Sequence, residues 1–280
     1  MNHNALLAIL LWSTVASAFK LTLSRMSPAS MLLYASLTSL TVFTFAVLVK
    51  KPKGWNSLRK NLQSAILGFL NPFLYYLVLF NAYSILPAQE AQALNYTWPL
   101  ILTVFAWLFL SQPLRVRGIF GVFMGFLGAL IVSSKGSIGS LSLSNILGDL
   151  LALSSALIWA SYWVLNLRDG RKAEVKMFWN FLFGSLYILT YVAWRGKLVL
   201  DALGIIGSVY VGLFEMGVTF LLWLRALEKE EASKVAGLVY LTPVLSLFFI
   251  TTIVREPLRA STIVGLALIL MGARIARGRG

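Results

Sequence analysis

Long apolar runs occupy nearly the whole chain, and no other feature limits its possible folds as strongly. A helix needs about 20 mostly apolar residues to cross the hydrocarbon core of a bilayer, and ten such runs follow one another along the 280 residues. Their predicted bounds are 5–23, 29–49, 62–83, 88–110, 116–134, 145–167, 176–194, 202–226, 232–254 and 260–276. Since a membrane β-barrel would show short alternating segments instead, the runs predict an all-α integral membrane protein with ten transmembrane helices.

The first run also has features of a secretory signal peptide. Ala16-Ser17-Ala18 fits a cleavage site and the residues before it fit an apolar region. Against cleavage, no positive residue precedes the run, and the second half of the chain contains a matching segment. We therefore interpret residues 5–23 as the first transmembrane helix.

The positive charge of the chain indicates its orientation in the membrane. Only 12% of the residues are charged, but the formal net charge is +14. With ten crossings and the N-terminus inside, 17 of the 24 Lys and Arg residues fall on the cytoplasmic side, as the positive-inside rule requires. We predict a multi-pass protein of the inner (plasma) membrane with both termini in the cytoplasm, whose partners are the bilayer and a small molecule, and not nucleic acid.

The two halves of the chain repeat each other. A shift of 144 residues places landmark residues of the first half on the same residue types in the second. The matching pairs are Gly68 and Gly212, Tyr96 and Tyr240, Pro99 and Pro243, Pro113-Leu114-Arg115 and Pro257-Leu258-Arg259, Gly121 and Gly265, and Gly128 and Gly272. In the first helix of each half the shift is 147, which places Trp12 on Trp159. Shared Pro, Gly, Tyr and Trp in one register indicate a true repeat.

Because each repeat has an odd number of helices, the second half begins on the opposite side of the membrane. The sequence thus predicts a first five-helix repeat in residues 1–135, a linker in 136–144 and an inverted second repeat in 145–280. Inverted repeats are a common plan of secondary transporters, with the substrate site near the midplane where the halves meet. A duplicated structural or enzyme fold is the alternative.

The chain lacks the residues that several other function classes require. The chain has no cysteine, and its single histidine, His3, lies in the N-terminal tail, so neither a thiolate nor a buried histidine metal site is expected. There is no P-loop and no pair of intramembrane acids, so we predict no cofactor, no metal and no enzyme activity. A channel would have a continuous polar lining, which the mid-span residues do not provide. Flipping of a lipid or polyprenyl-linked cargo remains an alternative within transport.

The repeat resembles the drug/metabolite transporter superfamily, in its ten-helix form with two EamA-type repeats, over almost the whole chain. The residues that carry this resemblance are Leu157-Ile158-Trp159-Ala160, Pro243, Arg255-Glu256-Pro257-Leu258, Gly265 and Gly272. The first repeat departs from the pattern: Ser13 stands where glycine is common, and Gln112 replaces the usual acid before Pro113. These departures do not affect the predicted fold but leave the substrate open.

Within the superfamily, the chain is most similar to the aromatic amino-acid exporters of the YddG type. This similarity rests on Trp12 and on Asn95-Tyr96-Thr97-Trp98-Pro99. The resemblance implies a secondary transporter, an exporter of small amphipathic metabolites such as aromatic or other hydrophobic amino acids, that works by alternating access around a central cavity.

Polar residues in the middle of a span are candidates for the transport pathway, because they are costly in lipid unless they face a cavity or a partner. Glu215 is the only acid so deep in any span, and its repeat equivalent is Asn71. The inversion should bring the two towards each other. Glu215 would contact a substrate amine or carry a coupling proton, since burial disfavours its charged form. A protonated side chain that only joins two helices is the structural alternative.

Three prolines lie deep in predicted spans and should bend their helices, because proline has no N–H to donate to the preceding turn. Pro72 follows Asn71, while Pro99 and Pro243 occupy equivalent positions in the two repeats. We predict kinks at all three, with a role in gating or in freeing a carbonyl group for the substrate; bends without binding are the alternative.

Aromatic residues make up 13% of the chain, and most should form interfacial belts or face lipid. Those expected to line the cavity lie on the helices that surround it in the resembled superfamily. Together with the polar candidates, the predicted substrate-binding set is Trp12, Asn71, Tyr75, Tyr76, Asn95, Tyr96, Trp98, Trp159, Trp163, Glu215, Trp223 and Tyr240. Gly121-x-x-x-Gly125 allows close helix contact. We expect it to pack the fifth helix within a monomer, with a dimer as the alternative.

Overall fold

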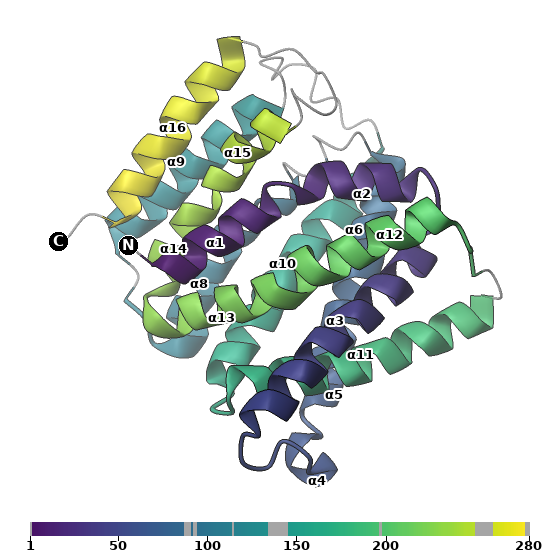
Figure 1. Cartoon of the computed structure of the whole chain (residues 1–280). Helices are drawn as coiled ribbons and strands as arrows, with labels where there is room; N and C mark the ends of the chain where they lie inside the picture. The colour runs from purple at the N-terminus through teal and green to yellow at the C-terminus, as the bar shows by residue number, and fades with distance from the viewer. Residues whose placement is uncertain are drawn as a thin grey trace.

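The computed structural model describes residues 2–86, 91, 94–113, 115–133, 145–195, 198–249 and 260–277. Figure 1 shows its helices packed side by side in one bundle. Each of the ten predicted runs corresponds, in its described part, to one helix or to consecutive helical segments. Six of these are long and apolar enough to cross a membrane, and shorter apolar helices accompany them.

In the first half, consecutive segments build the first and third helices. The elements are α1 (His3–Trp12), α2 (Val15–Leu23), α3 (Pro28–Lys50), the short α4 (Leu58–Asn61), α5 (Ser64–Gly68), η1 (Phe69–Leu74), α6 (Tyr75–Ile85), α8 (Trp98–Leu110) and α9 (Val116–Ser133). The predicted linker 136–144 lies outside the described residues.

The second half follows the same order. Its elements are α10 (Ile146–Arg168), α11 (Ala173–Arg195), α12 (Ala202–Val211), η3 (Gly212–Gly217), α13 (Val218–Lys229), α14 (Ala232–Val239), α15 (Leu241–Phe249) and α16 (Ala260–Arg277). The motif Arg255-Glu256-Pro257-Leu258 lies outside the described residues.

Short polar side chains begin several of the long helices. Ser27 accepts a hydrogen bond from the backbone N–H of Ser30, and Pro28 occupies the first turn of α3. Asn145 caps α10 and Asp201 caps α12 in the same way. Each cap satisfies an N–H that the helix itself leaves unpaired, which explains why these helices begin where the apolar runs begin.

The first helix is interrupted at Ser13 and Thr14, where the sequence predicts one continuous span. The hydroxyl group of Ser13 donates to the carbonyl oxygen of Leu10 at 2.6 Å, and that of Thr14 donates to Leu11 at 2.8 Å. Two successive hydroxyls that bond to the preceding turn compete with the backbone ladder and bend the helix. The bend lies beside Trp12, in the middle of the chain's first crossing.

Helices of one half pack against helices of the other half in symmetric pairs. α3 packs against α11, and α9 packs against α16. α1 contacts α13, as α10 in the other half contacts α6. Exchanging the halves therefore maps these contacts onto one another, which is the arrangement expected of two inverted repeats.

Glycines bring α9 and α16 into backbone contact. A Cβ atom on Gly128 would lie 2.6 Å from the carbonyl oxygen of Gly265, and one on Gly272 would lie 2.5 Å from that of Gly121. Because Gly121 and Gly128 correspond to Gly265 and Gly272, the contact is reciprocal, as a two-fold relation requires. The glycine motif of the fifth helix thus packs within the chain.

We expect Gly128→Ala to lower the free energy of unfolding by about 2 kcal/mol, because the added methyl group meets backbone atoms that cannot move without separating the helices. Gly170→Ala is the matched control, since a Cβ atom at Gly170 meets nothing within 4 Å. Thermal unfolding of both variants in detergent measures the difference. Equal stability of the two variants would contradict the reciprocal contact.

Candidate functional site

Two helix interruptions lie at equivalent positions near the centre of the bundle. η1 contains Asn71, where the backbone leaves the helical region between two helical segments, and η3 contains Glu215 in a π-helical turn. A π-helical turn inside an α-helix is rare and often occurs at functional sites. The two central polar residues therefore both lie where their helices are interrupted, but in different backbone settings.

The two interruptions have different local causes. In η1, Pro72 has no N–H for the preceding turn and Asn71 leaves the helical region, with φ −154° and ψ 125°. In η3, the hydroxyl group of Thr219 donates to the carbonyl oxygen of Phe214, and Gly217 adopts φ −82° and ψ −92°. Proline in one repeat and a threonine with a glycine in the other are recognised causes of helix kinks.

Glu215 is buried and held between aromatic side chains of the first repeat. Its Oε1 accepts a hydrogen bond from the hydroxyl group of Tyr76 at 3.0 Å, and its backbone carbonyl oxygen accepts one from the indole N–H of Trp12 at 3.4 Å. Only 7% of Glu215 is exposed. Both partners come from the opposite half, so this carboxyl group lies where the two repeats meet.

Asn71, its repeat equivalent, lies apart from this contact. It is fully buried beside the hydroxyl group of Tyr162, and its amide makes no well-aligned hydrogen bond. Asn71 is not among the described residues that line the central cavity, whereas Glu215 is. The two equivalent positions therefore differ in what they face.

A cavity of about 60 Å³ lies next to Glu215, between helices of both repeats. Seven of the predicted binding residues line it: Trp12, Tyr75, Asn95, Tyr96, Trp98, Trp159 and Glu215. The amide of Asn95 donates to the hydroxyl group of Ser155 at 2.9 Å. The lining combines aromatic faces with one carboxyl group.

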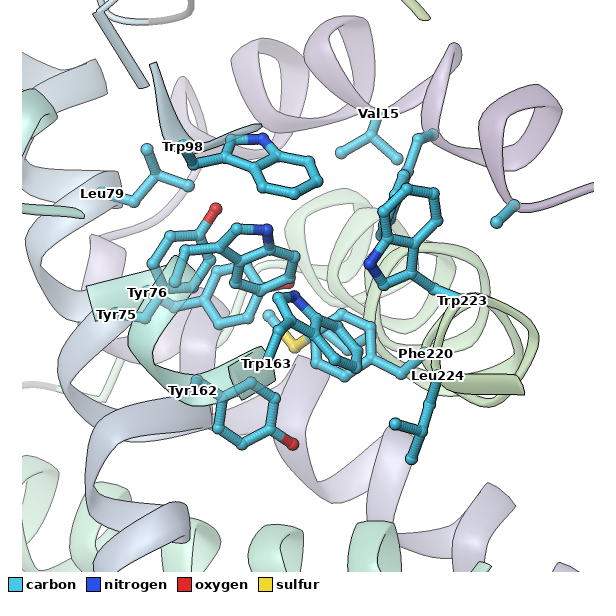
Figure 2. Close-up of a cluster of buried hydrophobic side chains, with 14 of the residues drawn as sticks. Val15, Tyr75, Tyr76, Leu79, Trp98, Tyr162, Trp163, Phe220, Trp223 and Leu224 are labelled. Atoms are coloured by element: carbon cyan, nitrogen blue, oxygen red, sulfur yellow. The ribbon is translucent and has the colours of Figure 1, made fainter. Parts of the chain in front are cut away.

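Trp159 contacts several other aromatic rings around this cavity, and Figure 2 shows three of them, Tyr75, Trp98 and Trp163, gathered in one cluster. It stacks on Tyr75 with ring centroids 4.3 Å apart and an interplanar angle of 29°. The edges of Trp98 and Trp163 meet it at centroid distances of 6.2 and 5.4 Å. Trp12 is 6.3 Å away and tilted. Offset and edge-to-face pairs are the favoured geometries of aromatic rings, so these rings pack in favourable arrangements.

The other predicted aromatic residues support the site without lining the cavity. Tyr76 is fully buried and donates a hydrogen bond to Glu215. Trp163 and Trp223 are also fully buried; Trp223 packs on Trp12 at 4.9 Å. Tyr240 contacts the ring of Tyr96 and donates its hydroxyl group to the carbonyl oxygen of Tyr96 at 3.2 Å. Of the described residues, these four do not belong to the lining.

Five further residues line the cavity that sequence reasoning missed: Val15, Phe19, Leu79, Tyr83 and Val239. Four of them follow from helical spacing. Val15 and Phe19 lie three and seven residues after Trp12, and Leu79 and Tyr83 lie four and eight residues after Tyr75. At helical spacing, each pair falls on the same face as the residue that it follows. This periodicity was available in the sequence, but the apolar character of these residues does not distinguish them from lipid-facing positions.

The prolines of the fourth and ninth helices lie next to interruptions in both repeats. α8 begins at Trp98, directly before Pro99, after a turn at Tyr96 and Thr97. α14 ends at Val239 and α15 begins at Leu241, two residues before Pro243. Tyr96 and Tyr240 thus occupy the breaks and contact each other across the repeats.

The site contains hydrogen-bonding and aromatic groups but little that a metal would bind. In the described ranges no group of three His, Cys, Asp or Glu side chains comes together. The lining offers apolar surface, hydrogen-bonding groups and one carboxyl group.

Comparisons with known proteins agree with this architecture. The model of the EamA-like transporter family matches twice, over residues 3–134 and 146–277. The chain is 29% identical over 210 residues to an uncharacterized transporter, YvbV, of Bacillus subtilis (strain 168), covering 72% of this chain and 67% of that protein. It is 25% identical over 272 residues to the aromatic amino acid exporter YddG of Ancylobacter novellus, covering 96% and 94%.

A solved crystal structure of another protein has the same fold, with a TM-score of 0.85, 24% sequence identity and coverage of 99% of this chain and 96% of that one. The predicted all-α membrane fold with two repeats is confirmed. Since the family model accounts for both halves, the chain belongs to the EamA-like transporter family, within the drug/metabolite transporter superfamily.

Proposed function

We propose that this protein is a secondary transporter that exports aromatic or other hydrophobic amino acids by alternating access at the central cavity. One observation carries the proposal: Glu215 faces a cavity whose other walls are mainly aromatic. The carboxylate would bind the ammonium group of an amino acid, and the faces of Trp159 and Tyr75 would contact its flat side chain. The YddG relative is an aromatic amino acid exporter, which supports the same substrate class.

The size of the cavity requires the site to change shape during transport. A volume of about 60 Å³ holds a few water molecules, whereas small-molecule pockets typically measure about 300–1,000 Å³. Binding would therefore need movement of aromatic side chains or of the helices that carry them. The interruptions at Ser13, Asn71, Tyr96 and Tyr240 and the π-helical turn η3 provide places where those helices can bend.

Counterflow in proteoliposomes tests the proposal. Purified protein is reconstituted into vesicles loaded with an unlabelled amino acid, and entry of labelled phenylalanine or tryptophan is followed. We expect saturable exchange with aromatic and large aliphatic amino acids, and little exchange with aspartate or lysine. Absence of counterflow with every amino acid of the panel would refute the proposed substrate class.

A groove on the bundle favours a second candidate, movement of a lipid. It has a volume of about 640 Å³ and lies between α2 and α12, with Leu21, Leu203 and Ile206 along it and Arg25 among its polar residues. An apolar groove beside the cationic side chain of Arg25 suits a lipid with an acyl chain and an anionic headgroup. Dithionite quenching of fluorescent lipids in the same vesicles distinguishes the two: rapid loss of inner-leaflet fluorescence would favour lipid movement.

We further propose that both termini lie in the cytoplasm, because 17 of the 24 Lys and Arg residues then lie on that side. A reporter fused after Gly280 should be active inside the cell, and one inserted within residues 136–143 should report the outside. Two reporters on the same side of the membrane would contradict an inverted arrangement of the repeats.

A further inference from the structure

Ion pairs join several helices at one end of the bundle. We define the basic end as the end where α3, α10 and α13 finish and α11 begins. There the carboxylate of Glu174, on α11, accepts hydrogen bonds from Lys50 at 2.5 Å and from Arg225. Lys50 ends α3 in the first repeat, and Arg225 belongs to α13 in the second. One buried carboxylate therefore links three helices across the boundary between the repeats.

A second contact strengthens this connection. Lys176 is one turn into α11 and only 1% exposed, yet its ammonium group is fully engaged. It donates to Glu228 of α13 at 2.8 Å and to the carbonyl oxygens of Asn166 and Asp169 at 3.0 and 3.1 Å. A buried cation with three acceptors holds α10, α11 and α13 together. We call Lys50, Glu174, Lys176, Arg225 and Glu228 the ion cluster.

The central cavity extends away from the ion cluster. From Trp12 the lining continues to Phe19, and from Tyr75 it continues to Tyr83, in both cases away from the basic end. On the side of the basic end, Trp163, Phe220 and Leu224 are fully buried, and Figure 2 shows them below Trp98 and Val15. In the described part of the bundle, these three buried side chains therefore pack between Glu215 and the basic end.

The positions that correspond to Glu174, Lys176, Arg225 and Glu228 at the other end of the bundle carry no ionisable side chain. α3 and α11 both have 23 residues, so Glu174 and Lys176 correspond to Ala29 and Met31. The shift of 144 places Arg225 and Glu228 on Asn81 and Ser84. Residues 27–31 contain no acid in any nearby register. When an inverted-repeat transporter closes at that other end, it cannot form the same ionic contacts.

We propose that the ion cluster biases the conformational equilibrium towards the state that is closed at the basic end. The inference rests on the alternating-access part of the proposed function. Opening at the basic end separates α3 and α13 from α11 and returns the charges to water. A partly exposed ion pair changes an equilibrium constant by up to about fivefold. If the pair forms in only one of the two conformations, it shifts the ratio of their populations by that factor.

Cysteine labelling measures this equilibrium without a substrate, and the chain contains no cysteine of its own. Val47→Cys places a thiol one turn before Lys50, at a fully buried position near the basic end. Val15→Cys places one in the lining of the cavity. Each cysteine variant is purified with and without Glu174→Gln and is treated with a small polar thiosulfonate. We expect the labelling rate at residue 47 to rise about fivefold and the rate at residue 15 to fall.

The controls separate gating from loss of structure. Lys234→Gln removes an ion pair with Glu231 at the same end of the bundle. Both residues lie at the start of α14, so the pair does not join two helices, and its loss should change neither labelling rate. Lys50→Gln, at a half-exposed side chain, replaces Glu174→Gln if the latter does not fold. An unchanged rate at residue 47 in both variants, or a rise at both reporters, would overturn the proposal. Labelling as expected without amino-acid counterflow would refute the substrate class but not the ion cluster.

Discussion

Glu215→Gln should weaken the binding of an aromatic amino acid at least tenfold, about 1.4 kcal/mol, while the protein stays folded. Glutamine keeps the size of the side chain and can still accept the hydrogen bond from Tyr76, but it cannot neutralise an ammonium group. Equilibrium binding to purified protein measures the loss. Glu230→Gln, at the end of α13, is the control and should bind like wild type.

Flux measurements on the same variant separate the roles that Glu215 can have. If it contacts the substrate charge, counterflow and net transport both decrease. If it carries a coupling proton, net transport driven by a pH gradient is lost but exchange persists, because exchange requires no net proton movement. A variant that matches wild type with and without a pH gradient would show that Glu215 only joins helices through Tyr76.

Trp159→Leu should reduce affinity roughly 30-fold, about 2 kcal/mol, as expected for a tryptophan at the centre of a binding site. The change removes the ring that stacks on Tyr75 and contacts Trp12 and Trp98. It should also lower the free energy of unfolding by about 3 kcal/mol, because a large buried side chain is shortened. Affinity and thermal unfolding are therefore measured together.

Trp163→Leu is the matched control for that experiment. Trp163 is one turn further along α10, equally aromatic and fully buried, but outside the cavity lining. It should lose similar stability with a much smaller effect on affinity. Equal losses of affinity in the two variants would mean that the cluster acts through packing alone.

Much of the fold could be predicted because a bilayer requires long apolar helices. The bounds of α3, α9 and α10 lie within a residue or two of the predicted runs, since charged or capping residues stand at the ends of each. The break at Ser13 and Thr14 could not be predicted in this way. Serine and threonine are common in membrane helices, and only the structure shows that both bond to the preceding turn.

The candidate site was less predictable, because hydropathy does not reveal which face of a membrane helix points inwards. Tyr75 and Tyr76 are neighbours in the middle of one span, yet one lines the cavity and the other lies behind it. In a soluble protein the polar face would identify the exposed side. In a bilayer both the lipid face and the packed face are apolar, so helix rotation depends on contacts such as the stack of Tyr75 on Trp159.

Photo-crosslinking tests most directly whether the central cavity binds the substrate. A phenylalanine analogue that carries a diazirine group is irradiated with the purified protein, and the modified residues are identified by mass spectrometry. We predict adducts on residues next to Glu215, such as Trp12, Tyr75 and Trp159, that excess tryptophan suppresses. Adducts confined to the groove between α2 and α12, or insensitive to competition, would contradict a central aromatic amino-acid site.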